Sequence, residues 1–228
     1  LHLLPDLVLD LVEAGRRLYA KGMVASNDGN LSARLPDGTI LVTPSGVCKG
    51  DLRTGELLRV DRDGRVLSGT LRPTSEMKMH LAVYRRREDV RAVVHAHPPV
   101  ATAFAVAGLP LDRVSLPETV FSLGPVVLVP YGTPSTQAVP DGVGQEITGT
   151  DTLLLSNHGA LTAGTSVMDA YFKMETLEHF AVISFHARLL GGERFLDSAE
   201  VDRLFGIRTR LFGRPDPREQ GGHLSNGG

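Results

Sequence analysis

The chain has 228 residues, of which 42% are hydrophobic and 22% charged, a composition typical of a globular protein with its own apolar core. Its net charge of -2 provides no basic excess for nucleic-acid phosphates or an anionic membrane. A single cysteine, Cys48, excludes an intramolecular disulfide and a thiolate zinc cluster. No apolar run could span a bilayer and no leader pattern opens the chain. We therefore expect a cytoplasmic protein that binds neither nucleic acid nor membranes.

The first ninety residues combine helical periodicity with hairpin signals. Apolar residues at helical spacing from Leu4 to Leu18 predict a helix that ends near Gly22. Alternating segments with a turn at Pro36-Asp37-Gly38, and again with a turn at Asp63-Gly64, predict two hairpins. A second helix is predicted from 73 to 87. Thr74 or Ser75 could cap it, and Glu76 in its first turn would suit the helix dipole.

The rest of the chain alternates strands and helices irregularly. We expect strands at 89–97, 125–131 and 151–157, a short helix at 101–108, a long helix at 168–190 and a loose tail at 213–228. Because hairpins accompany the helices, the sequence predicts one mixed α/β domain over residues 1–228 with a largely antiparallel sheet.

Two histidines at the end of a predicted strand are the sharpest chemical signal. His95 and His97 lie two residues apart, so both imidazoles would leave the same face of the strand and could chelate a divalent metal such as zinc. The same spacing also fits two ordinary polar residues at a strand end. His158, in an Asn-His-Gly turn after another apolar strand, could be a third ligand or a solvated turn residue.

Glu76 is the candidate acid/base, since a carboxylate beside a metal can exchange a proton with substrate. Its position is equally explained by the helix dipole. Small polar residues in three loops could line an anion pocket: Gly29, Asn30, Ser45, Gly46, Thr74 and Ser75. No Lys or Arg stands out beside them. His80 has no evident partner, and His179 is expected in a solvated stretch with Glu178 and Lys173.

Taken together, the ordered motifs GNLSAR, TPSG, PTSE, HAH and NHG resemble the class II aldolase/adducin family, from the first helix to about Leu190. The resemblance implies an α/β/α sandwich with a central, mainly antiparallel sheet, assembled as a homotetramer with the site at a subunit interface. It implies a Zn²⁺ ion, or another divalent metal, bound by His95, His97 and His158. Glu76 would be the catalytic acid/base and a possible fourth ligand. Gly29, Asn30, Ser45, Gly46, Thr74 and Ser75 would contact a substrate phosphate.

The expected reaction is a metal-dependent aldol cleavage of a ketose 1-phosphate, such as L-fuculose 1-phosphate, to dihydroxyacetone phosphate and an aldehyde. The chain departs from aldolases of this family because it has no tyrosine near Ser115–Glu118 or in the C-terminal region, and Glu118 is a conceivable substitute. Epimerases, dehydratases and decarboxylases share the fold and remain alternatives, as does a non-catalytic adducin-like interaction domain. The resembling 4-epimerases carry aspartate where this chain has Glu76, which favours the aldolase.

Overall fold

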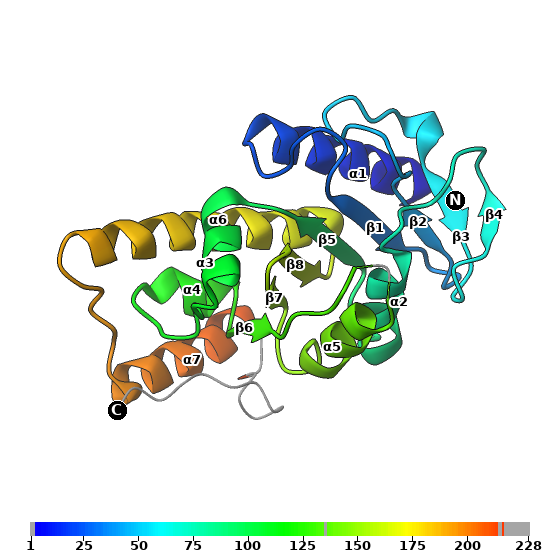
Figure 1. Ribbon diagram of the computed structural model, residues 1–228. Helices are drawn as coiled ribbons and strands as arrows, with labels where there is room; N and C mark the ends of the chain where they lie inside the picture. Colours follow the sequence, from blue (N-terminus) through cyan, green and yellow to red (C-terminus); the bar gives the residue numbers. More distant parts are fainter. Residues whose placement is uncertain (1–2, 135, 214–215, 217–228) are drawn as a thin grey trace.

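The computed structural model describes residues 3–134, 136–213 and 216, and its central feature is one eight-stranded sheet with helices on both faces (Figure 1). The helices are α1 (Leu3–Ala20), α2 (Met77–Arg86), α3 (Pro99–Ala107), α4 (Pro117–Ser122), α5 (Ala138–Glu146), α6 (Val167–Leu189) and α7 (Ser198–Phe212), with a 3-10 turn, η1, at Thr54–Glu56. The strands are β1 (Asn30–Arg34), β2 (Ile40–Val42), β3 (Leu58–Val60), β4 (Val66–Ser68), β5 (Ala92–Ala96), β6 (Val126–Val129), β7 (Thr152–Leu155) and β8 (Gly159–Gly164).

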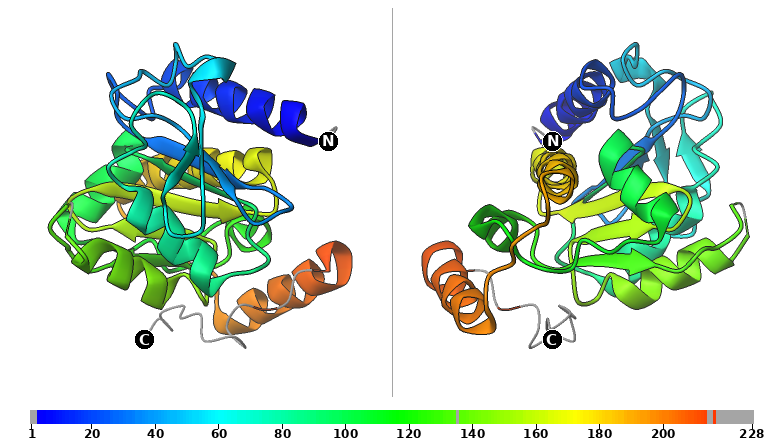
Figure 2. Two further views of the ribbon diagram at one scale, coloured as in Figure 1. Left: turned by 90° about the vertical axis from the view of Figure 1, so that its right-hand side faces the viewer. Right: turned by 60° about the vertical axis from the view of Figure 1, so that its left-hand side comes forward.

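The strands follow the order β4-β3-β2-β1-β5-β8-β7-β6, and every neighbouring pair is antiparallel except β6 and β7. Helices α1, α3 and α6 cover one face of this sheet, and α2 and α5 cover the other (Figure 2). The structure thus confirms the expected α/β/α sandwich with a mainly antiparallel sheet. Helix α7 packs on α4 through a separate small apolar cluster beyond the end of the sheet (Figure 1).

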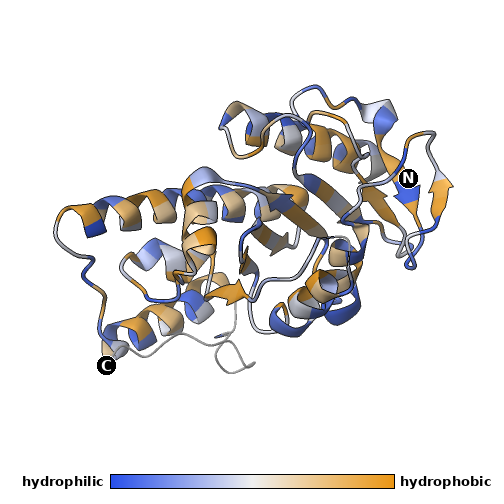
Figure 3. Ribbon diagram, viewed as in Figure 1, coloured by the Kyte–Doolittle hydropathy of each residue, from blue (hydrophilic) through white to orange (hydrophobic). Residues whose placement is uncertain are grey.

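Alternation along each strand divides the apolar side chains between two cores. In β5, for example, Val94 and Ala96 join the core under α1 and α6, whereas Val93 joins the core under α2 and α5. Strands β5 and β7 are accordingly apolar along most of their length, while the surrounding helices have mixed hydropathy (Figure 3). Among the described residues, no helix is both long enough and apolar enough to cross a bilayer.

Several predicted elements are confirmed, and others were missed. Both hairpins, the strands at the centre of the sheet and the long helix are present. The second helix begins at Met77 rather than at 73, and Glu76 precedes it without a side-chain cap, so the predicted Thr74 or Ser75 cap and the first-turn position of Glu76 are wrong. The prediction had no strand at β8 and no helix at α4, α5 or α7. Neither β8 nor α5 has a clear hydrophobic periodicity, because β8 consists mainly of small residues and α5 contains Pro140 and two glycines. Most of the predicted loose tail lies outside the described residues.

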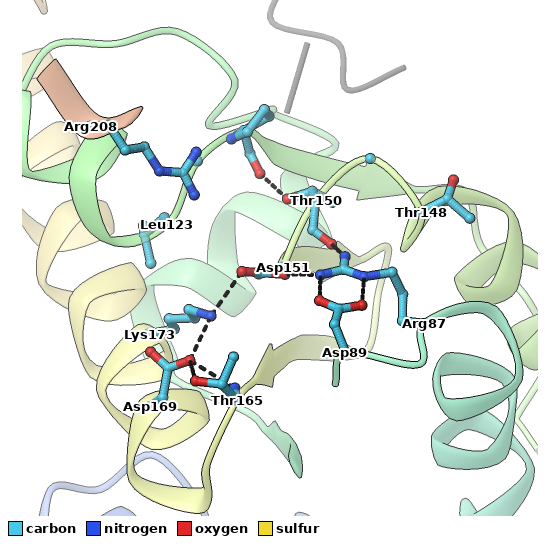
Figure 4. Close-up of a pocket in the computed structure, with 13 residues that line it drawn as sticks. Arg87, Asp89, Leu123, Thr148, Thr150, Asp151, Thr165, Asp169, Lys173 and Arg208 are labelled. Carbon is cyan, nitrogen blue, oxygen red and sulfur yellow. Dashed lines mark hydrogen bonds and ion pairs between the residues drawn. The ribbon is translucent and has the colours of Figure 1, made fainter. Parts of the chain in front are cut away.

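A network of partly buried ion pairs connects the starting ends of β5 and β7 (Figure 4). Lys173 of α6 donates to Asp151 at 2.8 Å and to Asp169 at 3.0 Å, while Arg87 bonds Asp89 at 2.7 Å and Asp151 at 2.9 Å. These residues line a cavity of ≈ 370 Å³. The expectation that Lys173 belongs to a solvated stretch is wrong, because the fold buries its ammonium between two carboxylates.

Replacing Lys173 should destabilise the fold more than replacing an exposed lysine. Lys173→Met removes the ammonium shared by the partly buried Asp151 and Asp169, although Asp151 keeps its ion pair with Arg87, so we expect the free energy of unfolding to fall by about 3 kcal/mol. Urea denaturation followed by circular dichroism measures this change, with the exposed Lys78→Met on α2 as the matched control. Equal stability of the two variants would show that the network contributes no net stability.

Candidate metal centre and acid/base site

Antiparallel pairing brings three histidines to the finishing ends of β5 and β7, opposite the ion-pair network. His95 lies within β5, His97 follows that strand, and His158 lies in the turn between β7 and β8. Their ring centroids are 4.7 Å apart for His95 and His158, 5.0 Å for His95 and His97, and 5.4 Å for His97 and His158. These three residues, hereafter the histidine cluster, are those that the sequence predicted to converge.

Local backbone geometry makes this convergence possible. In the β7–β8 turn, Asn157 adopts a left-handed conformation with φ 56°, which asparagine tolerates better than most residues, and His158 follows it. Gly159 then allows β8 to approach β5 closely, since a Cβ atom there would lie 2.6 Å from the Ala96 carbonyl oxygen and 2.6 Å from His97 Cδ2. The Asn-His-Gly motif therefore places the His158 imidazole next to those of His95 and His97.

Glu76 closes the cluster from the start of α2. Its Oε2 lies 3.2 Å from His95 Nε2, and its Oε1 lies 3.0 Å from His158 Nε2. The Asn30 side-chain amide donates to Oε2 at 2.7 Å, and the Glu76 backbone N–H is 3.3 Å from Thr74 Oγ1. The candidate acid/base thus directly contacts two of the three histidines, although they lie 19 and 82 residues further along the chain.

The donor set fits a divalent metal ion. One ligand atom from each of the three histidines lies within 4.8 Å of the others, and a metal with nitrogen distances of about 2.0–2.1 Å would draw these atoms closer together. His95 Nδ1 lies 2.8 Å from the Ala160 carbonyl oxygen, so Nδ1 carries the proton and the Nε2 lone pair faces the cluster. Such a hydrogen bond behind the ring is typical of metal-binding histidines.

The charges within the cluster shift its titration. Burial raises the pKa of Glu76, but the opposing effects of His95 and His158 are together larger and hold that pKa below its usual range. Burial, together with the neighbouring His95 and His158, lowers the pKa of His97 to about 4. Burial lowers the pKa of His95, yet the Glu76 carboxylate and the Ala160 carbonyl raise it more, so its pKa lies above the usual value. At neutral pH His97 is therefore in its neutral, ligand-competent form.

The predicted phosphate residues lie in three loops that the fold joins. The Ser45 N–H donates to the Arg72 carbonyl at 2.9 Å, and Pro44 forms a bridge with Pro73, which places the TPSG loop beside the PTSE loop. Ser45, Gly46 and Ser75 are exposed, as an anion contact requires, whereas Thr74 is buried. Gly29 is buried with φ 70°, and a Cβ atom there would lie 2.9 Å from the His95 carbonyl oxygen.

A buried lysine, which the sequence analysis missed, stands behind two of these loops. Lys49 is 1% exposed, and its ammonium donates to the carbonyl oxygens of Val47 at 2.6 Å and Asn27 at 3.1 Å. Burial lowers the pKa of Lys49 below its usual range. The only sequence signal was its place three residues after Gly46 in TPSGVCKG. Lys49 therefore links the loops at 26–30 and 44–49 by hydrogen bonds.

His80 also has partners, contrary to the prediction. Its Nε2 lies 2.5 Å from Asn30 Oδ1, and its Nδ1 lies 2.7 Å from Ser32 Oγ. Asn30 itself is 4% exposed, and its side chain bridges His80 and Glu76. The sequence did hold a signal for this contact. Glu76 and His80 are four residues apart at the predicted helix, and Asn30 and Ser32 are two apart in the predicted strand, so each pair would lie on one face of its element.

Comparison with known proteins agrees with this fold. The chain is 35% identical over 201 residues to 3-oxo-tetronate 4-phosphate decarboxylase from Escherichia coli (strain K12), covering 86% of this chain and 93% of the relative. It is 29% identical over 197 residues to 5-deoxy-D-ribulose 1-phosphate aldolase from Bacillus thuringiensis serovar kurstaki, covering 86% and 92%. A solved structure of L-fuculose 1-phosphate aldolase superposes with a TM-score of 0.83 at 26% identity, covering 92% and 97%.

A sequence model described as "Class II Aldolase and Adducin N-terminal domain" matches residues 9–185, which is more than half of the chain and includes Glu76 and the three residues of the histidine cluster. The chain belongs to the class II aldolase and adducin family.

Proposed function

We propose that this protein is a metal-dependent lyase that decarboxylates a phosphorylated four-carbon 3-oxo acid to dihydroxyacetone phosphate and CO₂. The relative from Escherichia coli named for a reaction of this kind aligns with 86% of the chain and spans the histidine cluster. This proposal replaces aldol cleavage, the reaction expected from the motifs, as the first choice. Both reactions pass through the same enediolate and differ in the group that leaves.

The observation that carries this choice is that, among the described residues, Glu76 is the carboxylate that contacts two of the three histidines, while Asp28 lies at the rim, 3.5 Å from His97 Nδ1. Aldol cleavage needs a second group to remove a proton from the hydroxyl that becomes the aldehyde. In the described part of the chain, no tyrosine hydroxyl is hydrogen-bonded to Glu76 or to the cluster, and Glu118 is exposed on α4. Decarboxylation needs no such group, because CO₂ leaves without a proton transfer.

In the proposed reaction the bond between C1 and C2 breaks, and its electron pair forms the double bond between C2 and C3. Glu76 takes a proton from water and gives it to C2, so one proton is consumed for each CO₂ released. The Asn30 amide, which donates to Oε2, would hold the carboxylate in place during this transfer. A divalent metal such as Zn²⁺, held by His95, His97 and His158, would supply Lewis-acid stabilisation of the developing negative charge.

The phosphate end of the substrate is proposed to lie on the three joined loops. Backbone amides and hydroxyls of Gly29, Ser45, Gly46, Thr74 and Ser75 would bind its oxygens, with Asn30 beside them. Since the Asn30 side chain bonds both Glu76 and His80, it also connects the phosphate loops to the acid/base. The buried Lys49 ammonium adds positive charge behind the loops.

Aldol cleavage of a ketose 1-phosphate is the second candidate. It is supported by the Bacillus thuringiensis relative, which is named as an aldolase for a ketose 1-phosphate and aligns over 86% of this chain. The glutamate at position 76 provides the same proton transfer to the enediolate in either reaction.

A substrate panel separates these candidates. The purified protein is given a 3-oxo-tetronate 4-phosphate, L-fuculose 1-phosphate, 5-deoxyribulose 1-phosphate and L-ribulose 5-phosphate, with separate assays for CO₂ and dihydroxyacetone phosphate. We expect the highest kcat/KM on the oxo acid, with equal amounts of the two products. Triose phosphate from a ketose 1-phosphate without CO₂ would instead establish the aldolase. Epimerisation of L-ribulose 5-phosphate alone would overturn both candidates.

Glu76→Gln should greatly slow turnover without weakening substrate binding. Glutamine keeps the size of the side chain but cannot carry the transferred proton, so we expect kcat to fall by about 10²–10⁴-fold with little change in KM. Steady-state kinetics on the preferred substrate measures both, and the exposed Glu88→Gln is the matched control. A kcat near that of the wild type would remove Glu76 from the proposed mechanism.

Metal binding should depend on the histidine cluster and on pH. We expect about one divalent ion per chain by elemental analysis, and its loss in His95→Ala/His97→Ala. Because the pKa of His95 is raised, its proton competes with the metal at a higher pH than for an ordinary histidine, so affinity should fall as the pH drops through that pKa. His97, with a pKa of about 4, adds a further loss only in more acidic solution.

The exposed pair His179→Ala/His186→Ala on α6 is the matched control for metal content. Full occupancy in the His95→Ala/His97→Ala variant, or an affinity that does not change with pH, would contradict the assignment of these imidazoles as ligands.

A further inference from the structure

Helix α2 and strand β1 face each other through matched polar side chains. Along the helix a spacing of four residues advances about 6 Å, and along the strand a spacing of two advances about 6.6 Å, so residues at these two spacings remain side by side over three positions. The side chains that share this interface, hereafter the polar ladder, are Glu76, His80 and Tyr84 from the helix side and Asn30, Ser32 and Arg34 from the strand.

Hydrogen bonds connect the polar ladder without a break. Asn30 Nδ2 lies 2.7 Å from Glu76 Oε2, and Asn30 Oδ1 lies 2.5 Å from His80 Nε2. His80 Nδ1 lies 2.7 Å from Ser32 Oγ, which in turn lies 2.8 Å from the Tyr84 hydroxyl. At the far end Arg34 donates to the Tyr84 carbonyl at 2.5 Å, and its guanidinium lies 4.7 Å from the centre of the Tyr84 ring.

The carboxylate at one end sets the direction of every hydrogen bond in this series of side chains. A carboxylate only accepts, so the Asn30 amide must turn its NH₂ group to Glu76 and its oxygen to His80. His80 must then donate from Nε2 and accept at Nδ1, which requires the Ser32 hydroxyl to donate to His80 and the Tyr84 hydroxyl to donate to Ser32. All the protons therefore point toward Glu76.

Burial keeps this arrangement from exchanging with water. Ser32 and His80 are 0% exposed, Asn30 is 4% and Tyr84 is 7% exposed. Burial lowers the pKa of His80 to about 3, which leaves the imidazole neutral, and burial raises the pKa of Tyr84, which keeps its hydroxyl a donor. A reversed tautomer at His80 would place the Nε2 lone pair against the Asn30 Oδ1 oxygen, acceptor to acceptor, and such a mismatch is costly in a buried network.

We propose that His80 is a positioning residue, which acts through the Asn30 amide to hold the Glu76 carboxylate in its proton-transferring orientation, with Ser32 and Tyr84 fixing the tautomer of His80. This role rests on the proposed lyase function, in which Glu76 carries the proton. His80 itself touches neither Glu76 nor the histidine cluster through a hydrogen bond in the described residues. Unlike a buried histidine with a purely structural role, His80 would affect the rate of the proton transfer that Glu76 performs.

The first test reads the tautomer and needs no activity. In a nitrogen-15 spectrum of the histidine-labelled full chain at neutral pH, His80 should be neutral, with the proton on Nε2 and an unprotonated Nδ1. Ser32→Ala should weaken this preference, because it removes the donor to Nδ1. A proton on Nδ1, or an imidazolium, in the wild type would overturn the proposal whatever the enzyme's substrate.

The second test separates kcat from KM on whichever sugar phosphate or oxo-acid phosphate the wild type turns over. His80→Leu should lower kcat about 10–100-fold, the range found when groups behind a reactive side chain are lost, with KM nearly unchanged. His80→Gln, whose amide can donate to Asn30 and accept from Ser32, should recover part of that loss. The exposed His179→Leu on α6 is the matched control and should have no effect.

Wild-type kcat in both His80→Leu and Ser32→Ala, or an effect confined to KM, would overturn the positioning role. If His80→Leu does not fold, the smaller Ser32→Ala change still decides the question, since it removes one hydroxyl from the ladder and leaves Glu76 and Asn30 intact. Failure of the wild type on the whole substrate panel would overturn the proposed function instead, and the tautomer spectrum would remain a separate readout of the ladder.

Discussion

The register of β5 in the middle of the sheet is the constraint on which the rest of the site depends. In this register Asn30 of β1 pairs with His95 on one side, and Leu161 of β8 pairs with His95 on the other. A slip of one residue would turn His95 toward α1 and α6 and bring an apolar residue to the site. Because both neighbours are antiparallel, the same register also brings the β7–β8 turn with His158 to the end of β5. The position of the imidazoles is thus a consequence of strand pairing in the apolar cores.

Polar groups are concentrated where the fold can satisfy them. The starting ends of β5 and β7 carry the ion pairs of Arg87 and Lys173, and the finishing ends carry the histidine cluster with Glu76. Between these ends the strands are buried and almost entirely apolar. A charged side chain inside the sandwich would be costly without a partner, so both groups of charges lie at the rims, where carboxylates and basic side chains can meet.

The interface between α2 and β1 is the exception, because it is polar and buried at once. Such an interface is acceptable only when each donor has an acceptor, and here the acceptor at the end of the series is the Glu76 carboxylate. This arrangement couples the reactive end of α2 to the interior of the sheet. Asn30 pairs with His95 and lies on the face of the sheet that α2 covers, where Glu76 and His80 together hold its side chain.

The sequence by itself determined the residue types, the local elements that carry them and the family to which the chain belongs. The two-residue spacing of His95 and His97, the Asn-His-Gly turn and the PTSE segment are local patterns, and local patterns can be read because alternation and turn chemistry act over a few residues. The helices with clear apolar periods and both hairpins could be predicted for the same reason. Segments made of small residues or interrupted by proline, such as β8 and α5, could not, since packing against distant elements decides their structure.

Only the tertiary structure decided which of the candidate residues meet. In the sequence, nothing distinguished His80, Lys49 and Lys173 from solvated residues. The partner of His80, Asn30, lies 50 residues away in the chain. The two lysines bind backbone carbonyls and carboxylates that face inward only after the sheet has formed. Glu76 could be explained by the helix dipole until the fold placed it between His95 and His158. The role of a buried polar group depends on partners that are distant in the chain. Strand register and helix packing determine those partners, and both depend on the whole set of apolar contacts.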